Sequence, residues 1–168
     1  MRQPDSDRVE VSTRSSASPD IVWRALTHER AAWWPDMAFD TCPGASLRET
    51  WDEGGVTVEA TGFVVTVEPP TQLTFRWTQP DWPNGYSTVA IEIVADEAGS
   101  LITLVETGLA RATGDRASLH SHDEGWRYHL DRLVRSSERS QEADDGRRPL
   151  VCGDGCEDNC DGRDEATR

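Results

Sequence analysis

Four histidines, His28, His120, His122 and His129, are the side chains best suited to acid–base chemistry near neutral pH. His28 and His120 are expected to face solvent, whereas His122 and His129 flank the apolar side of a predicted helix. These two are seven residues apart, a rise of about 10 Å, while residues that share a metal ion on a helix stand three or four apart. We therefore expect no shared metal site and no cofactor. His122 is expected to face a cavity and donate a hydrogen bond to a ligand, the alternative being a surface or structurally satisfied histidine.

Three cysteines near the end of the sequence, Cys152, Cys156 and Cys160, are weak candidates for metal ligands. A structural zinc site has four ligands, and the fourth would have to be the distant Cys42 or a carboxylate. The same acidic segment is not an EF-hand, because Arg168 occupies the position of the bidentate glutamate. The sequence favours reduced thiols over a metal site here.

No catalytic constellation is visible in the sequence. Two serines precede His122 closely, but nothing indicates an oxyanion hole or a strained nucleophile turn. Glu59, Arg76 and Glu106 lie on predicted strands and could point into a cavity, although a charged residue on a strand usually lies on its solvated face. The sequence thus leaves open whether the protein is an enzyme and leans towards a binding function.

Seven tryptophans are spread over nearly every predicted element. They either fill a core too wide for Leu and Val alone or line a cavity for a flat apolar ligand. We assign Trp23 to the core and Trp126 to the cavity. The full set of predicted lining residues is Trp33, Trp34, Met37, Phe39, Trp51, Phe63, Phe75, Trp77, Tyr86, His122 and Trp126.

The elements that would position these residues can be read from periodicity and turn signals. Residues 9–13 alternate as a strand, and Ser18 followed by Pro19 predicts a helix start. A second short helical segment ends at Pro35. Five strands are predicted at 46–51, 56–66, 72–78, 87–95 and 100–107, separated by short Gly- and Pro-containing turns that indicate an antiparallel meander.

The last predicted element is an amphipathic helix over 115–137, with Trp126, Leu130 and Leu133 on one side. Its apolar stripe must be buried on the sheet. We therefore predict an α+β, helix-grip protein of order β-α-α-β5-α, in which a six-stranded antiparallel sheet wraps round a long C-terminal helix. Residues 1–7 would be an extension, 8–138 the domain and 139–168 a disordered, acidic, cysteine-containing tail.

The composition excludes several classes of partner. Seventeen basic residues against 31 acidic ones give a formal charge of −14, which disfavours binding to nucleic acid and to anionic membranes. No apolar run approaches the roughly 20 residues that span a bilayer, and no secretory signal is visible. A cytoplasmic protein is expected, and the sequence is compatible with a homodimer.

Three motifs in order carry a family resemblance. They are VWRALT at 22–27 with Trp33 and Trp34 after it, GFVVTVEPPTQLTFRW at 62–77, and Gly125 and Trp126 with Leu130 and Leu133. Over about residues 8–138 the chain resembles the START-like or SRPBCC superfamily. Within it, the chain is most similar to the family related to the C-terminal domain of the activator of heat-shock protein 90 ATPase.

The resemblance implies the helix-grip fold and a hydrophobic small molecule held between sheet and long helix. Two alternatives remain: a polyketide cyclase or dehydratase-like enzyme, and an interaction module associated with stress or chaperones. The chaperone cofactor has a separate N-terminal domain for its partner that this sequence lacks, so a chaperone partner is not expected. Fold alone does not choose between these functions.

Overall fold

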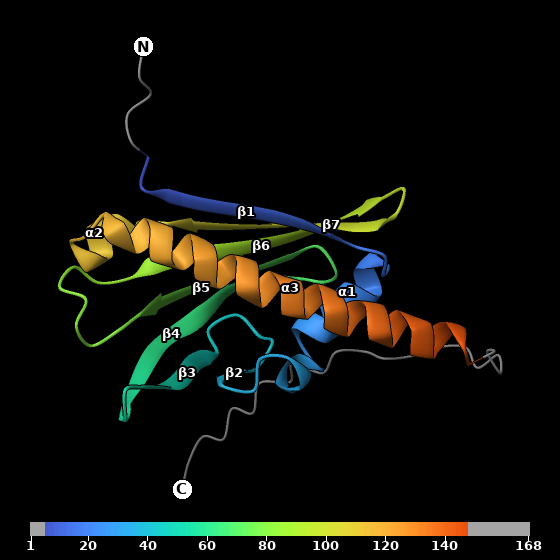
Figure 1. The fold of residues 1–168 in the computed structure, drawn as a ribbon, viewed down its shortest axis with the longest axis horizontal. Helices are drawn as coiled ribbons and strands as arrows, with labels where there is room; N and C mark the ends of the chain where they lie inside the picture. Colours follow the sequence, from blue (N-terminus) through green and yellow to red (C-terminus); the bar gives the residue numbers. More distant parts are fainter. Residues whose placement is uncertain (1–5, 148–168) are drawn as a thin grey trace, which may run out of the picture.

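One antiparallel sheet of seven strands forms the framework of the computed structural model, which describes residues 6–147 (Figure 1). The strand order across the sheet is β1-β7-β6-β5-β4-β3-β2. The strands are β1 (Arg8–Ser15), β2 (Met37–Phe39), β3 (Ser46–Glu53), β4 (Val56–Glu68), β5 (Gln72–Thr78), β6 (Ser87–Asp96) and β7 (Gly99–Thr107).

Strands β2 to β7 form a meander, because each short turn returns the chain beside the strand it has just left. The turn between β3 and β4 contains Gly54 and Gly55, both with the positive φ that glycine adopts without steric cost. Strand β1 closes the order by pairing with β7 along its whole length, from Arg8 opposite Thr107 to Ser15 opposite Ser100.

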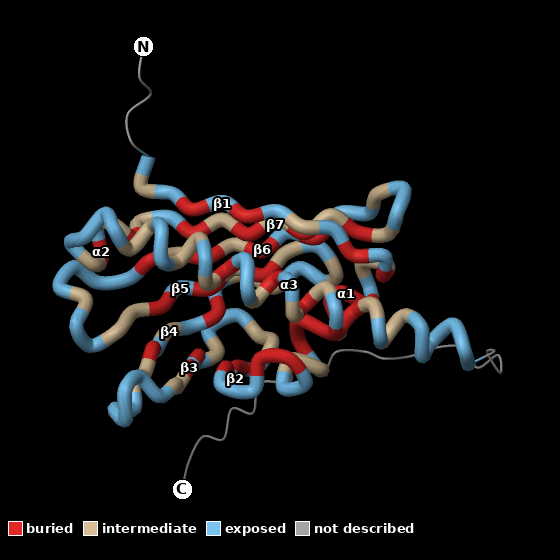
Figure 2. The backbone as a smooth tube through the Cα atoms, in the orientation of Figure 1, coloured by how far each residue is buried: buried red, intermediate tan, exposed pale blue. Residues whose placement is uncertain are grey.

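Alternate residues of the central strands build the core. In β7 the buried positions are Ser100, Ile102, Leu104 and Glu106, and the residues between them are partly exposed. The same alternation buries Leu73, Phe75 and Trp77 of β5. Figure 2 shows the buried segments gathered on the middle strands and on the first helix.

The helices cover one face of this sheet (Figure 1). They are α1 (Pro19–Leu26), the 3₁₀ turn η1 (Arg30–Ala32), α2 (Leu109–Thr113) and α3 (Ala117–Asp145). Ser18 caps α1 by accepting a hydrogen bond from the Ile21 N–H, and Pro19 occupies the first turn, as predicted. The long α3 packs against β1 and α1 and buries Trp126, Leu130 and Leu133.

The helix-grip, α+β architecture is confirmed, with three differences in detail. The sheet has seven strands rather than six, because Met37–Phe39 pairs with β3; three residues are too few to show a strand period in sequence. The short α2 was not predicted. Helix α3 ends at Asp145, so the first residues of the predicted tail are helical. Residues 148–168 lie outside the described part.

Candidate functional site

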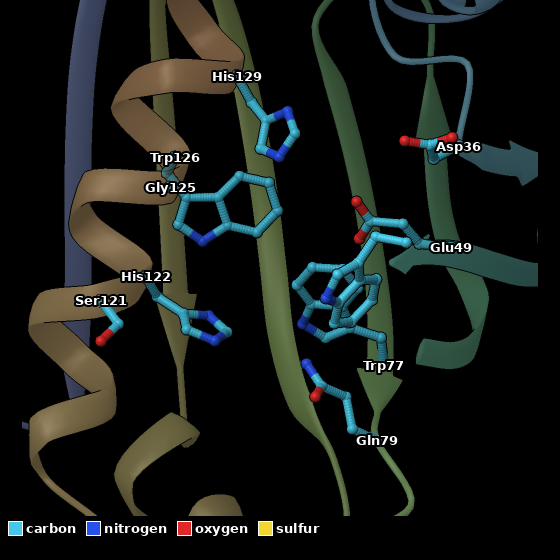
Figure 3. Close-up of a pocket in the computed structure, with 10 residues that line it drawn as sticks. Asp36, Glu49, Trp77, Gln79, Ser121, His122, Gly125, Trp126 and His129 are labelled. Atoms are coloured by element: carbon cyan, nitrogen blue, oxygen red, sulfur yellow. The ribbon is translucent and has the colours of Figure 1, made fainter. Parts of the chain in front are cut away.

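A cleft of about 410 Å³ opens between α3 and strands β3 and β5 (Figure 3). Three tryptophans form its apolar walls, namely Trp51 on β3, Trp77 on β5 and Trp126 on α3. Trp77 and Trp126 pack ring to ring, with their centroids 5.4 Å apart. The complete lining is Asp36, Glu49, Trp51, Trp77, Gln79, Ser121, His122, Gly125, Trp126 and His129.

A fully buried carboxylate, Glu106 of β7, lies behind these walls with an exposed fraction of 0%. Its Oε1 accepts hydrogen bonds from Trp77 Nε1 at 3.1 Å and from Ser87 Oγ at 2.6 Å. Its Oε2 accepts from Trp126 Nε1 at 2.7 Å and lies 2.8 Å from His122 Nδ1. Four donors therefore converge on one carboxyl group and tie β5, β6 and α3 to β7.

Two opposing effects act on the Glu106 pKa. Burial raises it, but the hydrogen bond from His122, the charge of that imidazole and the bonds from Ser87 and Trp126 together lower it below the ordinary value for glutamate. The group is therefore ionised at neutral pH. A buried charge needs this full set of partners, because an uncompensated one would be strongly unfavourable.

His122 is held by Glu106 in one tautomer. An ionised carboxylate only accepts hydrogen bonds, so the Nδ1 that faces it carries a proton. In the neutral ring the Nε2 is then the acceptor. The side chain of His122 is 20% exposed and lines the cleft. The centroid of its ring lies 6.0 Å from the ring centroid of Trp82.

A second carboxyl group, Glu49 of β3, faces the cleft from the opposite wall (Figure 3). It is 9% exposed, and its Oε1 accepts a hydrogen bond from Trp34 Nε1 at 2.9 Å. Burial is the largest effect on its pKa and raises it, and the nearby Asp36 acts in the same direction. The bond from Trp34 and the charge of His122 offset this only in part.

The Glu49→Gln variant tests this raised pKa. A carboxyl group whose pKa is higher in the folded than in the unfolded state binds a proton on folding. The stability of the protein therefore falls as pH rises from the unfolded-state pKa to the folded-state pKa. Glutamine cannot ionise and can still accept from Trp34. We expect the variant to be more stable than wild type at pH 8 and the difference to shrink towards pH 4, in urea unfolding curves. A stability difference between variant and wild type that does not change with pH would contradict the raised pKa of Glu49.

His129, one helical turn beyond Trp126, forms the upper end of the cleft in Figure 3. Its ring stacks on Trp34 with centroids 4.5 Å apart, and its buried Nδ1 has no hydrogen-bond partner among the described residues. Burial, and then the charge of Arg132, lower its pKa to about 4, while Asp36 acts in the opposite direction. His129 is therefore neutral at pH 7.

The structure divides the predicted lining residues into three groups. Those that line the cleft are Trp51, Trp77, His122 and Trp126. Those buried without lining it are Trp33, Trp34, Met37, Phe39 and Phe75. Of these, Trp34 lies behind Glu49 and bonds to it, while Phe39 lies under the guanidinium of Arg30.

Phe63 and Tyr86 do not face the cleft, which corrects the prediction for both. Each is more than a third exposed, and their rings contact each other edge to face at 5.9 Å. Phe63 of β4 pairs with the exposed Arg76 of β5, whose guanidinium lies 5.6 Å from the Tyr86 ring centroid. Successive strand residues alternate between faces, so all three lie opposite the buried Phe75 and Trp77.

Sequence reasoning missed Glu49 and left open whether Glu106 faces a cavity or the solvent. A signal for both is present in the alternation. Glu106 follows Ile102 and Leu104 at two-residue steps, and Glu49 follows Leu47 in the same way, which places each carboxylate on an apolar face. Glu59, by contrast, pairs with Arg48 at 2.7 Å. A charged residue that alternates with apolar residues along a strand therefore indicates a buried carboxylate, even though most charged residues on strands face solvent.

Within residues 6–147 no group of three or more His, Cys, Asp or Glu side chains is arranged to hold a metal ion. The weak candidates Cys152, Cys156 and Cys160 lie outside the described residues. No helix in the described part is both long and apolar enough to cross a membrane.

Comparison with solved structures identifies proteins of the same fold. Protein MLL2253 from Mesorhizobium loti matches with a TM-score of 0.66 at 22% identity, over 79% of this chain and 98% of that one. CalU16 from Micromonospora echinospora matches with a TM-score of 0.58 at 26% identity, over 81% and 84%. DynU16, from the dynemicin biosynthetic locus, matches with a TM-score of 0.67 at 26% identity, over 82% of this chain and 49% of its own.

Comparison with curated proteins gave no match. The family model of the Activator of Hsp90 ATPase homolog 1-like protein matches residues 16–138. This match confirms the resemblance carried by the three sequence motifs and spans most of the chain. The chain belongs to the family of Activator of Hsp90 ATPase homolog 1-like proteins.

Proposed function

We propose that this protein binds a small, flat, amphipathic molecule in the cleft between α3 and the sheet. The observation that carries the proposal is the lining itself, in which Trp51, Trp77 and Trp126 provide apolar walls around a few polar groups. Ligand sites are commonly built in this way, with apolar area supplying affinity and a few polar groups fixing orientation. Burial of apolar surface stabilises such a complex by about 25 cal/mol per Å².

The polar groups of the cleft favour a ligand with oxygen substituents. His122 Nε2, the Glu49 carboxyl and the Gln79 amide all belong to side chains that line the space. Hydroxyl and carbonyl groups on a ring system would satisfy these partners, whereas an alkyl chain would leave them without hydrogen bonds. DynU16, a similar structure, belongs to a biosynthetic locus, which is compatible with a natural-product ligand for the present protein.

Native mass spectrometry of the purified protein, followed by organic extraction, tests for a co-purifying ligand. Flavone, anthraquinone and myristate are then titrated while the tryptophan fluorescence is recorded. We expect the two ring compounds to bind more tightly than myristate. The proposal fails if no extra mass co-purifies and none of the three compounds changes the fluorescence.

Trp51→Ala tests whether the cleft is the binding site. Trp51 is partly exposed, so its removal is expected to leave the fold intact. Losing the apolar contact of one aromatic wall is expected to weaken binding by roughly 10- to 100-fold, equivalent to about 1.5–3 kcal/mol. Phe63→Ala removes an aromatic ring from the opposite face of the sheet and serves as the control. Equal affinities for the two variants would place the ligand elsewhere.

Gly125→Ala should change stability and binding in opposite directions. Gly125 lies inside α3 and lines the cleft, and a Cβ at this position would meet no atom within 4 Å. Alanine is expected to stabilise the helix by up to about 1 kcal/mol, but its methyl group would occupy space that the ligand needs. Thermal unfolding of the variant tests the gain in stability, and ligand titration tests the loss of affinity. An unchanged affinity would show that the ligand does not approach this turn of the helix.

A further inference from the structure

The cleft contains an imidazole, from His122 of α3, and a carboxyl group, from Glu49 of β3, on opposite walls. We propose that it is a general acid–base site acting on a flat carbonyl compound, in which His122 removes a proton from the carbon next to the carbonyl and Glu49 protonates the carbonyl oxygen. This inference rests on the proposed function, since it uses the same cleft and the same class of ligand.

His122 has the geometry of a general base. Its Nδ1 lies 2.8 Å from the carboxylate of Glu106, which leaves Nε2 as the basic nitrogen on a side chain that lines the cleft. Glu106 is held in turn by Trp77, Ser87 and Trp126, so the imidazole cannot change its orientation without disturbing a buried network. A buried carboxylate behind the ring also stabilises the imidazolium that forms when Nε2 takes up a proton. Glu106 does not line the cleft and acts as a positioning residue.

Glu49 has the environment of a general acid. It is nearly buried, and the largest effect on it, burial, favours its neutral form. Its position is set by the bond from Trp34 Nε1 to Oε1. Figure 3 shows Glu49 extending from the sheet side and His122 from α3, with the tryptophan rings beside them. The two neighbouring carboxyl groups thus have pKa values shifted in opposite directions, that of Glu106 lowered and that of Glu49 raised by burial.

The remaining titratable groups of the cleft are less suited to either role. His129 is neutral and stacked on Trp34, with its Nδ1 buried. Asp36 is exposed at the rim, where water competes for its hydrogen bonds. These two groups shape the electrostatics of the upper cleft, while the proton transfers fall to His122 and Glu49.

The proposed reaction is the interconversion of a ketone and its enol. The Nε2 lone pair of His122 forms a bond to the departing proton, and the electrons of the broken C–H bond form the new carbon–carbon double bond. The carbonyl π electrons move to oxygen, which takes the proton of Glu49. The products are the enol, an imidazolium and a carboxylate; in the reverse direction each proton returns. The balance includes no oxidant, reductant or further reactant.

Hydrogen–deuterium exchange tests the reaction directly. β-Tetralone and benzoylacetone, two flat ketones with acidic C–H groups, are incubated with the protein in D₂O, and loss of the α-proton signal is followed by NMR. Imidazole at the same concentration provides the reference rate. We expect the protein to exceed this reference by about 100-fold or more, the usual range of positioned acid–base groups.

Matched variants assign the roles. His122→Gln and Glu49→Gln each remove one proton-transferring group and are expected to lower the exchange rate by about 100-fold. His120→Gln, an exposed histidine on the same helix, and Glu53→Gln, an exposed glutamate on the same strand, are the controls and should retain the rate. Circular dichroism confirms that each variant is folded. Glu106→Gln is expected to lower kcat with KM unchanged, and a change in KM alone would overturn its positioning role.

The outcomes separate the two proposals. Exchange above the reference that is lost in both cleft variants and kept in both controls supports the acid–base site. Binding of either ketone, seen as a change in tryptophan fluorescence, without exchange above the reference overturns the acid–base inference and leaves the binding function standing. If neither ketone exchanges and none of the ring compounds binds, both proposals fail.

Discussion

Glu106→Ala is expected to destabilise the protein by at least about 3 kcal/mol, the cost of removing one partner from a buried charged network. The carboxylate is 0% exposed and accepts from four side chains. Trp77 and Ser87 would keep their mutual bond at 3.0 Å, but Trp126 and His122 would each leave a donor without its partner. An unpaired buried donor loses its hydration without compensation.

Urea unfolding at pH 7 measures this effect, with Glu92→Ala as the control. Glu92 lies on the neighbouring strand β6 and is exposed, so its removal is expected to change stability by no more than about 0.5 kcal/mol. Similar losses for the two variants would show that the network around Glu106 does not support the fold. Because the same network orients His122, a lower rate of the proposed proton exchange should accompany the loss of stability.

His129→Phe is expected to reduce, by about 3 kcal/mol, the unfolding free energy that the protein loses between pH 7 and pH 4. This amount is the free-energy equivalent of lowering a histidine pKa from 6.5 to about 4. The unfolded chain takes up the proton at this histidine more readily than the folded protein does. Its contribution to stability is therefore complete above pH 6.5, is lost as pH falls from 6.5 towards 4, and is constant below 4. Phenylalanine keeps a ring against Trp34 and cannot titrate.

The measurement is the free energy of unfolding at several values between pH 7 and pH 4. Wild type and the exposed-site control His120→Gln should both lose stability over this range, and His129→Phe should lose about 3 kcal/mol less. Glu49 contributes with the opposite sign, because its pKa is raised, and it is present in all three proteins. Parallel curves for wild type and His129→Phe would contradict the lowered pKa of His129.

Much of the fold could be predicted because it depends on local sequence. The Ser18 cap, the alternation along β5 and the turn glycines Gly54 and Gly55 act within a few residues of themselves. Strand β2 was not predicted because it lacks such a local signal: its three residues become a strand only by pairing with β3. The length of α3 was underestimated because its polar last turns lack an apolar stripe, although Ser137 bonds across to Ser15 of β1 and Gln141 accepts from the Ser18 N–H.

The candidate site was predicted only in part. The aromatic residues of the sequence predicted the apolar walls, and four predicted residues do line the cleft, namely Trp51, Trp77, His122 and Trp126. Phe63 and Tyr86 were misassigned because composition does not tell which face of a strand a ring occupies. A β-bulge between Val64 and Thr66 shifts the register of β4 against β5, so counting along the strand would not place every residue of β4 reliably.

The sequence by itself determined most of the elements, their order and the family, because periodicity, caps and turns are properties of neighbouring residues. Only the tertiary structure decided that Glu106, from β7, accepts from His122 and Trp126 of α3 and from Trp77 of β5. The pKa shifts of Glu49, Glu106 and His129 follow from burial and from partners that are mostly far away in the chain. Desolvation and hydrogen bonding are set by what surrounds a group in space, and sequence distance carries little information about that.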